Sequence, residues 1–323
     1  MKMEAPLPVE LSQSPRLAVM PWTHMLLALA VVAIWGSNFV VIRIALDHLP
    51  PLLFATLRFC LVFLPAAFFV KRPAVAWRWL ALYGVAIGFG QFGLIYIAVG
   101  GKMAPGHISP GLASLVVQAQ VFFTIGLALY FSGERIRGFQ IAALLLAIAG
   151  IGVILAHSDG TTTPFGLLLT LGAAISWAIG NHAAKASGTT DILAFVIWSA
   201  LFSIPPLLVA TLLMEGPTAI VAGLAQANAL TWGAVLWQTV ANTLFGYVAW
   251  GWLLARHPAA TVSPVALLVP VFGMGASALL LGEGLPAWKL IAAALVIGGL
   301  AINTLWPMAS RLPGYPWRRG AVD

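Results

Sequence analysis

Apolar stretches of about 20 residues run through almost the whole chain, separated by short segments that carry proline, glycine or charge. Within each stretch the apolar residues are nearly continuous and do not alternate with polar ones, a pattern that favours helices over strands. About 20 apolar residues are enough for a helix to cross a bilayer. We therefore expect spans 1 to 10 near residues 24–46, 51–70, 77–99, 110–131, 138–157, 164–185, 191–214, 229–254, 260–281 and 286–307. The segment 215–228 is expected to be the longest loop between spans.

The composition agrees with a lipid environment. The chain is 61% hydrophobic and only 8% charged, whereas a soluble domain is typically about a quarter charged. In lipid, every backbone polar group must be paired internally, so spans are helices or closed barrels. The fold class expected is an all-α integral membrane protein. The single cysteine, Cys60, excludes a disulfide within the chain.

The basic residues indicate how the chain is oriented. With ten spans, both termini lie on one side, and that side holds twelve of the sixteen Lys and Arg residues, against Lys102 and Lys289 on the other. Arg43 and Arg58 fall within spans 1 and 2. The positive-inside rule then places both termini in the cytoplasm. Because the basic residues are scattered over short loops, the net charge of +7 does not indicate nucleic-acid binding.

Several sequence features occur twice. Trp35 and Arg43 are repeated 142 residues later as Trp177 and Lys185, and the pair Ser114 and Glu134 is repeated 149 residues later as Ser263 and Glu283. We expect a cytoplasmic tail at 1–23, one five-helix repeat at 24–157, a second at 164–307, and a second tail at 308–323. An odd number of spans per repeat inverts the second copy in the membrane. Inverted repeats are typical of alternating-access transporters, which bind their solute between the repeats near the midplane; a duplicated structural scaffold is the alternative.

The candidate solute-binding residues are mostly amides, since polar side chains in lipid tend to face the bundle interior. An amide offers donors and acceptors together, which suits a neutral or zwitterionic solute. Each amide could instead join two helices. Gln118 and Gln120 point about 200° apart on a helix, so we expect them to divide these two roles. The candidates are Trp35, Asn38, Arg58, Gln91, Gln118, Gln120, Asn181, Gln238, Asn242 and Tyr247.

Arg58 is the only basic residue well inside a span. It could meet the carboxylate of a solute. Alternatively, it could extend its charge to the membrane surface or bond backbone carbonyls at a helix end.

Glu134 and Glu283 precede spans 5 and 10, and we expect each to cap the span that follows, because a carboxylate is favourable near a helix N-terminus; a proton site is the alternative. Pro264 and Pro270 are expected to interrupt span 9 and expose backbone groups. No carboxylate falls at mid-span, where ion-coupling sites usually have one. We therefore expect no catalytic residues, no metal site and no cofactor.

The sequence resembles a known family through several runs in order: WGSNFVVIRIAL, PPLLFATLRFCLVFLPAAFFVKRP, GLASLVVQAQVFFTIGLALYFSGER, SWAIGN and SPVALLVPVFGMGASALLLGE. Together they resemble EamA-type proteins of the drug/metabolite transporter superfamily over residues 24–305. The resemblance implies ten helices in two inverted halves, a bacterial inner-membrane location, and export of small amino-acid-related metabolites such as cysteine and O-acetylserine.

The function expected is therefore export of such metabolites by alternating access, with a small-molecule solute and the lipid bilayer as partners and a homo-oligomer left open. A broader drug or toxic-compound exporter is the alternative within transport. A membrane-embedded enzyme would need paired acidic or histidine residues, and only Asp47–His48 and His157–Asp159 come close. A structural or receptor-like membrane protein is a third class.

Overall fold

The computed structural model describes residues 20–100, 107–132, 136–157 and 162–309. Over these ranges the chain is helical, and the one β contact is an isolated bridge between Ile108 and Thr162. Nine of the described helices are long and apolar enough to cross a membrane. A tenth continuous helix runs through residues 229–256, and its mid-span polar residues lower its mean hydropathy. The all-α ten-helix prediction is confirmed.

The elements follow the predicted spans closely. The first half contains α1 (Trp22–Ala45), α2 (Pro51–Phe63), η1 (Ala66–Phe68), α3 (Trp77–Gly84), η2 (Val85–Gly93), α4 (Leu94–Gly100), α5 (Pro110–Val116), η3 (Val117–Ala119), α6 (Gln120–Ser132) and α7 (Gly138–Ala156). The second half contains α8 (Pro164–Ser187), α9 (Ile192–Ala210), η4 (Thr211–Glu215), α10 (Gly216–Gln226), α11 (Ala229–Leu236), η5 (Trp237–Phe245), α12 (Gly246–Arg256), α13 (Ala259–Val262), η6 (Ser263–Leu268), α14 (Val269–Leu281) and α15 (Ala287–Ala309).

One expectation about a loop between spans was wrong. The segment 215–228 is mostly helix α10, which begins after a turn at Gly216, whose φ is +78°; only glycine adopts that conformation freely. Pro217 then occupies the first turn, where a missing N–H costs nothing. The prolines Pro205 and Pro206 do not interrupt α9, which continues through them to Ala210.

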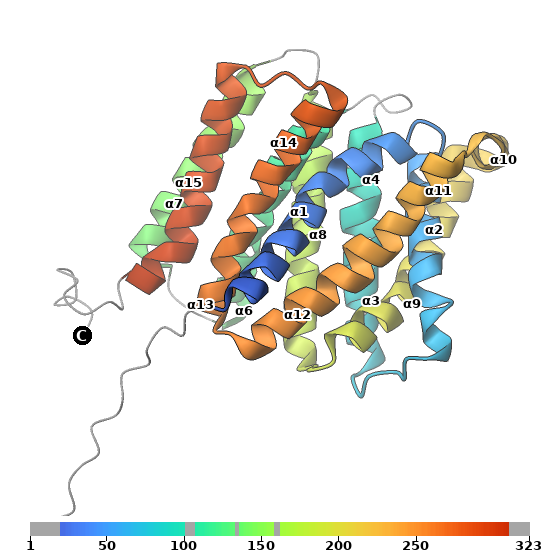
Figure 1. Ribbon diagram of the computed structural model, residues 1–323, viewed down its shortest axis with the longest axis horizontal. Helices are drawn as coiled ribbons and strands as arrows, with labels where there is room; N and C mark the ends of the chain where they lie inside the picture. The colour runs from blue at the N-terminus through green and yellow to red at the C-terminus, as the bar shows by residue number, and fades with distance from the viewer. Residues whose placement is uncertain (1–19, 101–106, 133–135, 158–161, 310–323) are drawn as a thin grey trace, which may run out of the picture.

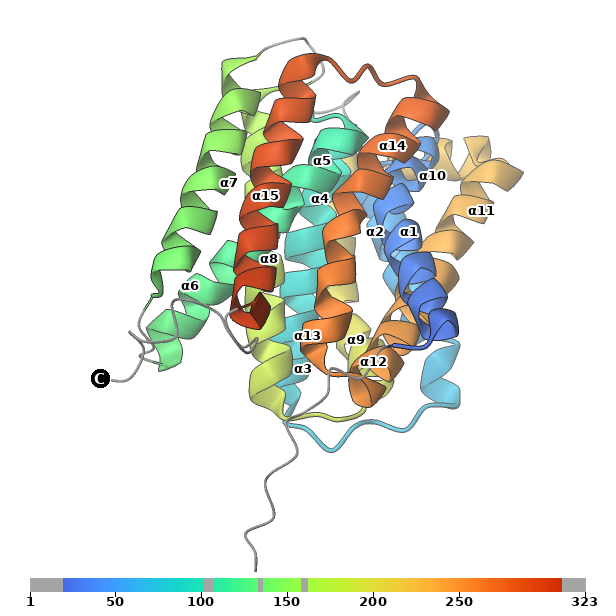
Figure 2. The ribbon, with the colours of Figure 1, turned by 60° about the vertical axis from the view of Figure 1, so that its left-hand side comes forward.

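The helices run back and forth between two ends of the molecule. Helix α1 begins and α15 ends at the bottom of Figure 1, as an even number of crossings requires. We call the end with the connections 46–50 and 282–286 the His48 end, and the opposite end the His257 end. Helices α7 and α15 lie side by side at one edge of the bundle (Figures 1 and 2). Their backbones approach so closely that a Cβ added at Gly299 would lie 2.5 Å from the Ala143 carbonyl oxygen.

The two halves pack directly against each other. Helix α1 of the first half packs on α14 of the second, and α2 packs on α9. Gly36 makes the first contact possible, because a Cβ there would lie only 2.5 Å from the Val269 carbonyl oxygen. Close approach through small residues is how helices gain contact area in lipid, where apolar burial gives no advantage.

Irregular helical turns occur at related positions in the two halves. Spans 3 and 8 each contain a nine-residue π-helical segment, η2 and η5, and spans 4 and 9 each contain a 3₁₀ segment, η3 and η6. In η5 the Thr243 hydroxyl donates to the Gln238 carbonyl at 2.8 Å. Pro264 lies within η6, and Pro270 lies in the first turn of α14, so span 9 is interrupted at its prolines as predicted. Such π segments are frequent at functional sites.

Carboxylates of the second half cap helices of the first half at the His48 end. Glu215 accepts hydrogen bonds from the backbone N–H groups of Leu52 and Leu53 at 2.6 and 2.9 Å. Glu283 accepts one from the N–H of Gly111 at 3.1 Å, at the start of α5. The expectation that Glu283 caps span 10 was therefore wrong: it lies beside α15 but its carboxylate turns across the repeat interface. Glu134 lies outside the described residues, and its capping role stays a prediction.

Candidate functional site

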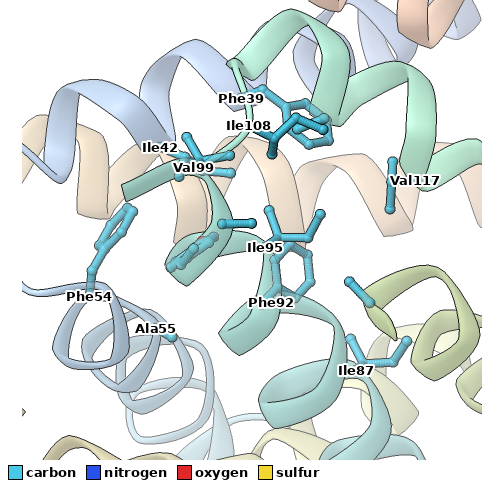
Figure 3. Packing of buried hydrophobic residues seen from close by; sticks show 14 of the residues in the cluster. Phe39, Ile42, Phe54, Ala55, Ile87, Phe92, Ile95, Val99, Ile108 and Val117 are labelled. Atoms are coloured by element: carbon cyan, nitrogen blue, oxygen red, sulfur yellow. The ribbon is translucent and has the colours of Figure 1, made fainter. Parts of the chain in front are cut away.

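A cavity of about 80 Å³ lies at the middle of the bundle, between the two halves. Its apolar wall belongs to the main hydrophobic cluster and includes Phe39, Ile42, Phe92, Ile95 and Val117, which Figure 3 shows together with their neighbours. Its polar and large aromatic wall consists of Trp35, Asn38, Gln91, Gln118, Trp177, Asn242 and Tyr247. Six of these seven were named as candidates from the sequence, and the seventh, Trp177, belongs to the repeat pair that the sequence singled out.

The amides reach the cavity from four helices. Asn38 comes from α1, Gln91 from η2, Gln118 from η3 and Asn242 from η5. The side-chain oxygens of Asn38 and Gln91 are buried, and no described residue donates a hydrogen bond to them. An unpaired buried acceptor costs about 1–3 kcal/mol. The cavity therefore offers hydrogen-bond acceptors that a polar solute can satisfy.

The indole rings of the duplicated motif both line the cavity, but only one has a described hydrogen bond. Trp35 Nε1 donates to the backbone carbonyl of Asn242 at 3.2 Å, which links span 1 to the π segment of span 8. Its ring packs on Tyr247 and Trp250, with centroids 5.8 and 5.3 Å away. Trp35 thus joins the two halves beside the cavity.

Three predicted amides lie elsewhere. Asn181 donates to the Gln120 side-chain oxygen at 3.0 Å, so this pair joins α8 to α6 outside the cavity. Gln118 lines the cavity whereas Gln120 does not, and the expectation that one of them contacts a solute stays a prediction. Gln238 is fully buried, does not line the cavity, and neither atom of its amide group has a partner.

Arg58 is fully buried next to the cavity. Its Nη1 donates to the Tyr96 hydroxyl at 2.9 Å, and its Nε and Nη2 donate to Thr243 Oγ1 at 3.2 and 2.8 Å. Its guanidinium carbon lies 3.7 Å from the centre of the Phe92 ring. Both structural alternatives considered from the sequence were wrong, since the side chain reaches neither the membrane surface nor a backbone carbonyl; it bonds hydroxyl groups.

A second charged group lies at the His48 end, away from the cavity. The Glu283 carboxylate pairs with Lys289 Nζ at 3.1 Å and accepts short hydrogen bonds from Ser109 and Ser277. Lys289, which the sequence analysis counted on the side opposite the termini, is buried. The cluster joins α5 of the first half to α14 and α15 of the second.

Sequence reasoning missed two features of the site. Phe92 separates Arg58 from the cavity, and it looked like one more apolar residue of span 3. The π segments were also missed, although the glycines at 88, 90 and 93 gave a signal that this helix tolerates irregular turns.

Ten helices in two inverted halves, with a central cavity between them whose largely apolar wall carries four amides, are the architecture of a multi-pass membrane transport protein. Comparison with known families agrees. The EamA-like transporter family matches residues 22–156 and again residues 164–305. The chain belongs to the EamA-like transporter family.

Individual relatives span nearly the whole chain. The "Probable amino-acid metabolite efflux pump" of Salmonella typhimurium is 44% identical, covering 86% of this chain and 93% of that protein. Its namesake from Escherichia coli is 42% identical, covering 91% and 96%. The "Probable terminal-alkyne amino-acid exporter" of Streptantibioticus cattleyicolor is 28% identical, covering 84% and 90%. A solved crystal structure, 21% identical, superposes with a TM-score of 0.59 over 91% of this chain and all of its own, which supports the fold.

Proposed function

We propose that this protein exports small amino-acid-related metabolites, of the kind represented by cysteine and O-acetylserine, from the bacterial cytoplasm. The observation that carries the proposal is the central cavity, whose polar wall is built by both halves and holds two buried acceptors without donors. Two relatives more than 40% identical bear the name of amino-acid metabolite efflux pumps. The solute contacts would come from Asn38, Gln91, Gln118, Asn242 and the aromatic rings of Trp35 and Tyr247.

The size of the cavity favours a small solute. Sites for drug-sized ligands usually measure about 300–1,000 Å³, whereas this cavity measures about 80 Å³. A broad drug or toxic-compound exporter fits it less well than a transporter of small metabolites.

The arrangement of the halves supports alternating access. Polar contacts between them at the His48 end include hydrogen bonds of Glu215 and Glu283, the pair His48–Thr231, and bonds between His107 and Thr163. At the His257 end, the ring nitrogens His24 Nδ1 and His257 Nε2 lie 2.7 Å apart and form a hydrogen bond that joins α1 to the residue after α12. Small sets of polar bonds at each end can break in turn while the packed helices move as bodies.

We place the protein in the bacterial inner membrane because of its family and its bacterial relatives named as probable efflux pumps. We place both termini in the cytoplasm because of the twelve-to-two distribution of basic residues. The His48 end then faces the periplasm and the His257 end the cytoplasm.

Counterflow in proteoliposomes tests the proposal. Vesicles preloaded with unlabelled L-cysteine or O-acetyl-L-serine should accumulate the labelled solute through the wild-type protein but not through Asn38→Leu. Vesicles carrying Asn181→Leu, which removes an amide that joins two helices outside the cavity, should retain counterflow. Absence of counterflow for every amino-acid-related solute tried, with folded wild-type protein in the vesicles, would refute the proposal.

A further inference from the structure

The positive charge of Arg58 has no carboxylate partner among the residues that the structure describes. A buried charge without an opposite charge is costly in a membrane protein, and it commonly marks a functional site. The four described carboxylates have other contacts: Asp47 pairs with Arg43, Asp191 caps α9 at Ala194, Glu215 caps α2, and Glu283 pairs with Lys289. Within this part of the chain, nothing neutralises Arg58.

Only one layer of side chains separates this charge from the central cavity. Phe92 and Tyr247 line both the cavity and a small space of about 10 Å³ beside Arg58. The guanidinium stacks on Phe92, 3.7 Å from the ring centre. Because only these two side chains lie between Arg58 and the cavity, its positive charge is weakly screened there and favours an anionic group on the cavity side of the Phe92 ring.

Two amides that line the cavity have the complementary requirement. The oxygens of Asn38 and Gln91 are buried acceptors that lack donors. An ammonium group carries three donors and no acceptor, so it can satisfy both oxygens. A solute that carries both an ammonium and a carboxylate therefore matches both the amide oxygens and the positive charge of Arg58.

We propose that Arg58 selects solutes that carry a carboxylate, through its positive charge acting across Phe92 and Tyr247, while Asn38 and Gln91 bind the ammonium group. This inference rests on the proposed function and narrows its solutes to amino-acid zwitterions. Arg58 sets the preference without touching the solute in the conformation described.

Arg58 also holds three spans together through Tyr96 and Thr243, so its charge and its hydrogen bonds must be tested separately. Tyr96→Phe removes one of the Arg58 hydrogen bonds and Thr243→Val removes two, and both variants leave the charge in place. Ser199→Asp does the reverse, because Ser199 lines the small space beside Arg58 and its hydroxyl is buried without a partner. An aspartate there keeps Arg58 and neutralises it, which serves if Arg58→Gln does not fold.

Ligand-dependent thermal stabilisation of the purified proteins measures the preference. The probes are L-cysteine and L-serine, each compared with its carboxamide, which keeps the ammonium and loses the carboxylate. For the wild type and Arg58→Lys we expect half-stabilising concentrations roughly tenfold lower for the amino acid than for the amide. The ratio of the half-stabilising concentration of the amide to that of the amino acid should approach one in Arg58→Gln and Ser199→Asp. It should stay near the wild-type value in Tyr96→Phe and Thr243→Val.

The contrary outcomes are distinct. A wild type that binds amides as well as amino acids would overturn carboxylate selection and leave metabolite export standing. Loss of the ratio in Tyr96→Phe and Thr243→Val would show that Arg58 acts only as a structural link. If no amino acid stabilises the wild type and counterflow is also absent, the proposed function fails and this inference fails with it.

Discussion

Glu283 accepts a hydrogen bond from the backbone N–H of Gly111, 172 residues earlier in the chain, at 3.1 Å. The same carboxylate pairs with the buried Lys289. Together with Glu215, which binds the N-terminus of α2, it joins the second half of the protein to the first at the His48 end. These contacts explain how two partly buried carboxylates, Glu215 and Glu283, are stable in a membrane protein.

The Glu283 cluster should make stability depend on pH. Burial raises the pKa of the Glu283 carboxyl, but hydrogen bonds from Ser109, Ser277 and Lys289 and the charge of Lys289 outweigh it, so the pKa lies below its ordinary value. A lowered pKa means that the carboxylate stabilises the fold at neutral pH and that this contribution is lost as the pH falls through the folded-state pKa.

Glu283→Gln should therefore lower the free energy of unfolding at pH 7 by about 3 kcal/mol, which a lower melting temperature would show. As the pH falls toward 4, the melting temperature of this variant should decline less than that of the wild type. Asp191→Asn is the matched control, since asparagine also caps a helix. Identical melting curves for Glu283→Gln and wild type across this pH range would contradict the assignment.

The contribution of residue 215 to stability should depend on how many acceptor oxygens its side chain presents to the N-terminus of α2. Glu215→Ala leaves two N–H groups of α2 unpaired and should cost about 1–2 kcal/mol of stability. Glu215→Gln keeps one carbonyl acceptor and should lose less. Thermal unfolding in detergent measures both, and a ranking with Gln below Ala would argue against the capping role.

The cavity amides should be required for transport and not for folding. Asn38→Leu and Gln91→Leu remove acceptors that have no donor among the residues that the structure describes, so neither loses a described hydrogen bond. We expect wild-type abundance and melting temperature with counterflow abolished. Full transport by both variants would exclude these amides as solute contacts.

The orientation can be tested with single cysteines after Cys60 is replaced. Ala74 lies in the exposed connection before α3, at the His257 end, and Leu285 lies in the connection before α15, at the His48 end. An impermeant thiol reagent should label Leu285→Cys in intact cells and Ala74→Cys only after permeabilisation. The reverse pattern would invert the topology.

Much of this architecture could be predicted because lipid leaves the backbone few choices. Long apolar stretches must be helices, and the recurrence of Trp35 as Trp177 identified two related halves. The polar residues of these halves, Asn38, Gln91, Gln118 and Asn242, could be assigned to the interior for the same reason. The fold and most of the cavity wall thus follow from local sequence and the cost of polar groups in lipid.

The tertiary structure decided which interior polar residues meet one another. Gln120 and Asn181 satisfy each other, Arg58 bonds hydroxyls of spans 3 and 8, and Glu283 caps α5 and not the helix that follows it. A helix face can be read from its sequence, but the partner of that face depends on how helices more than 100 residues apart cross. Hydrogen bonds are short and directional, so a shift of one helical turn is enough to exchange one partner for another.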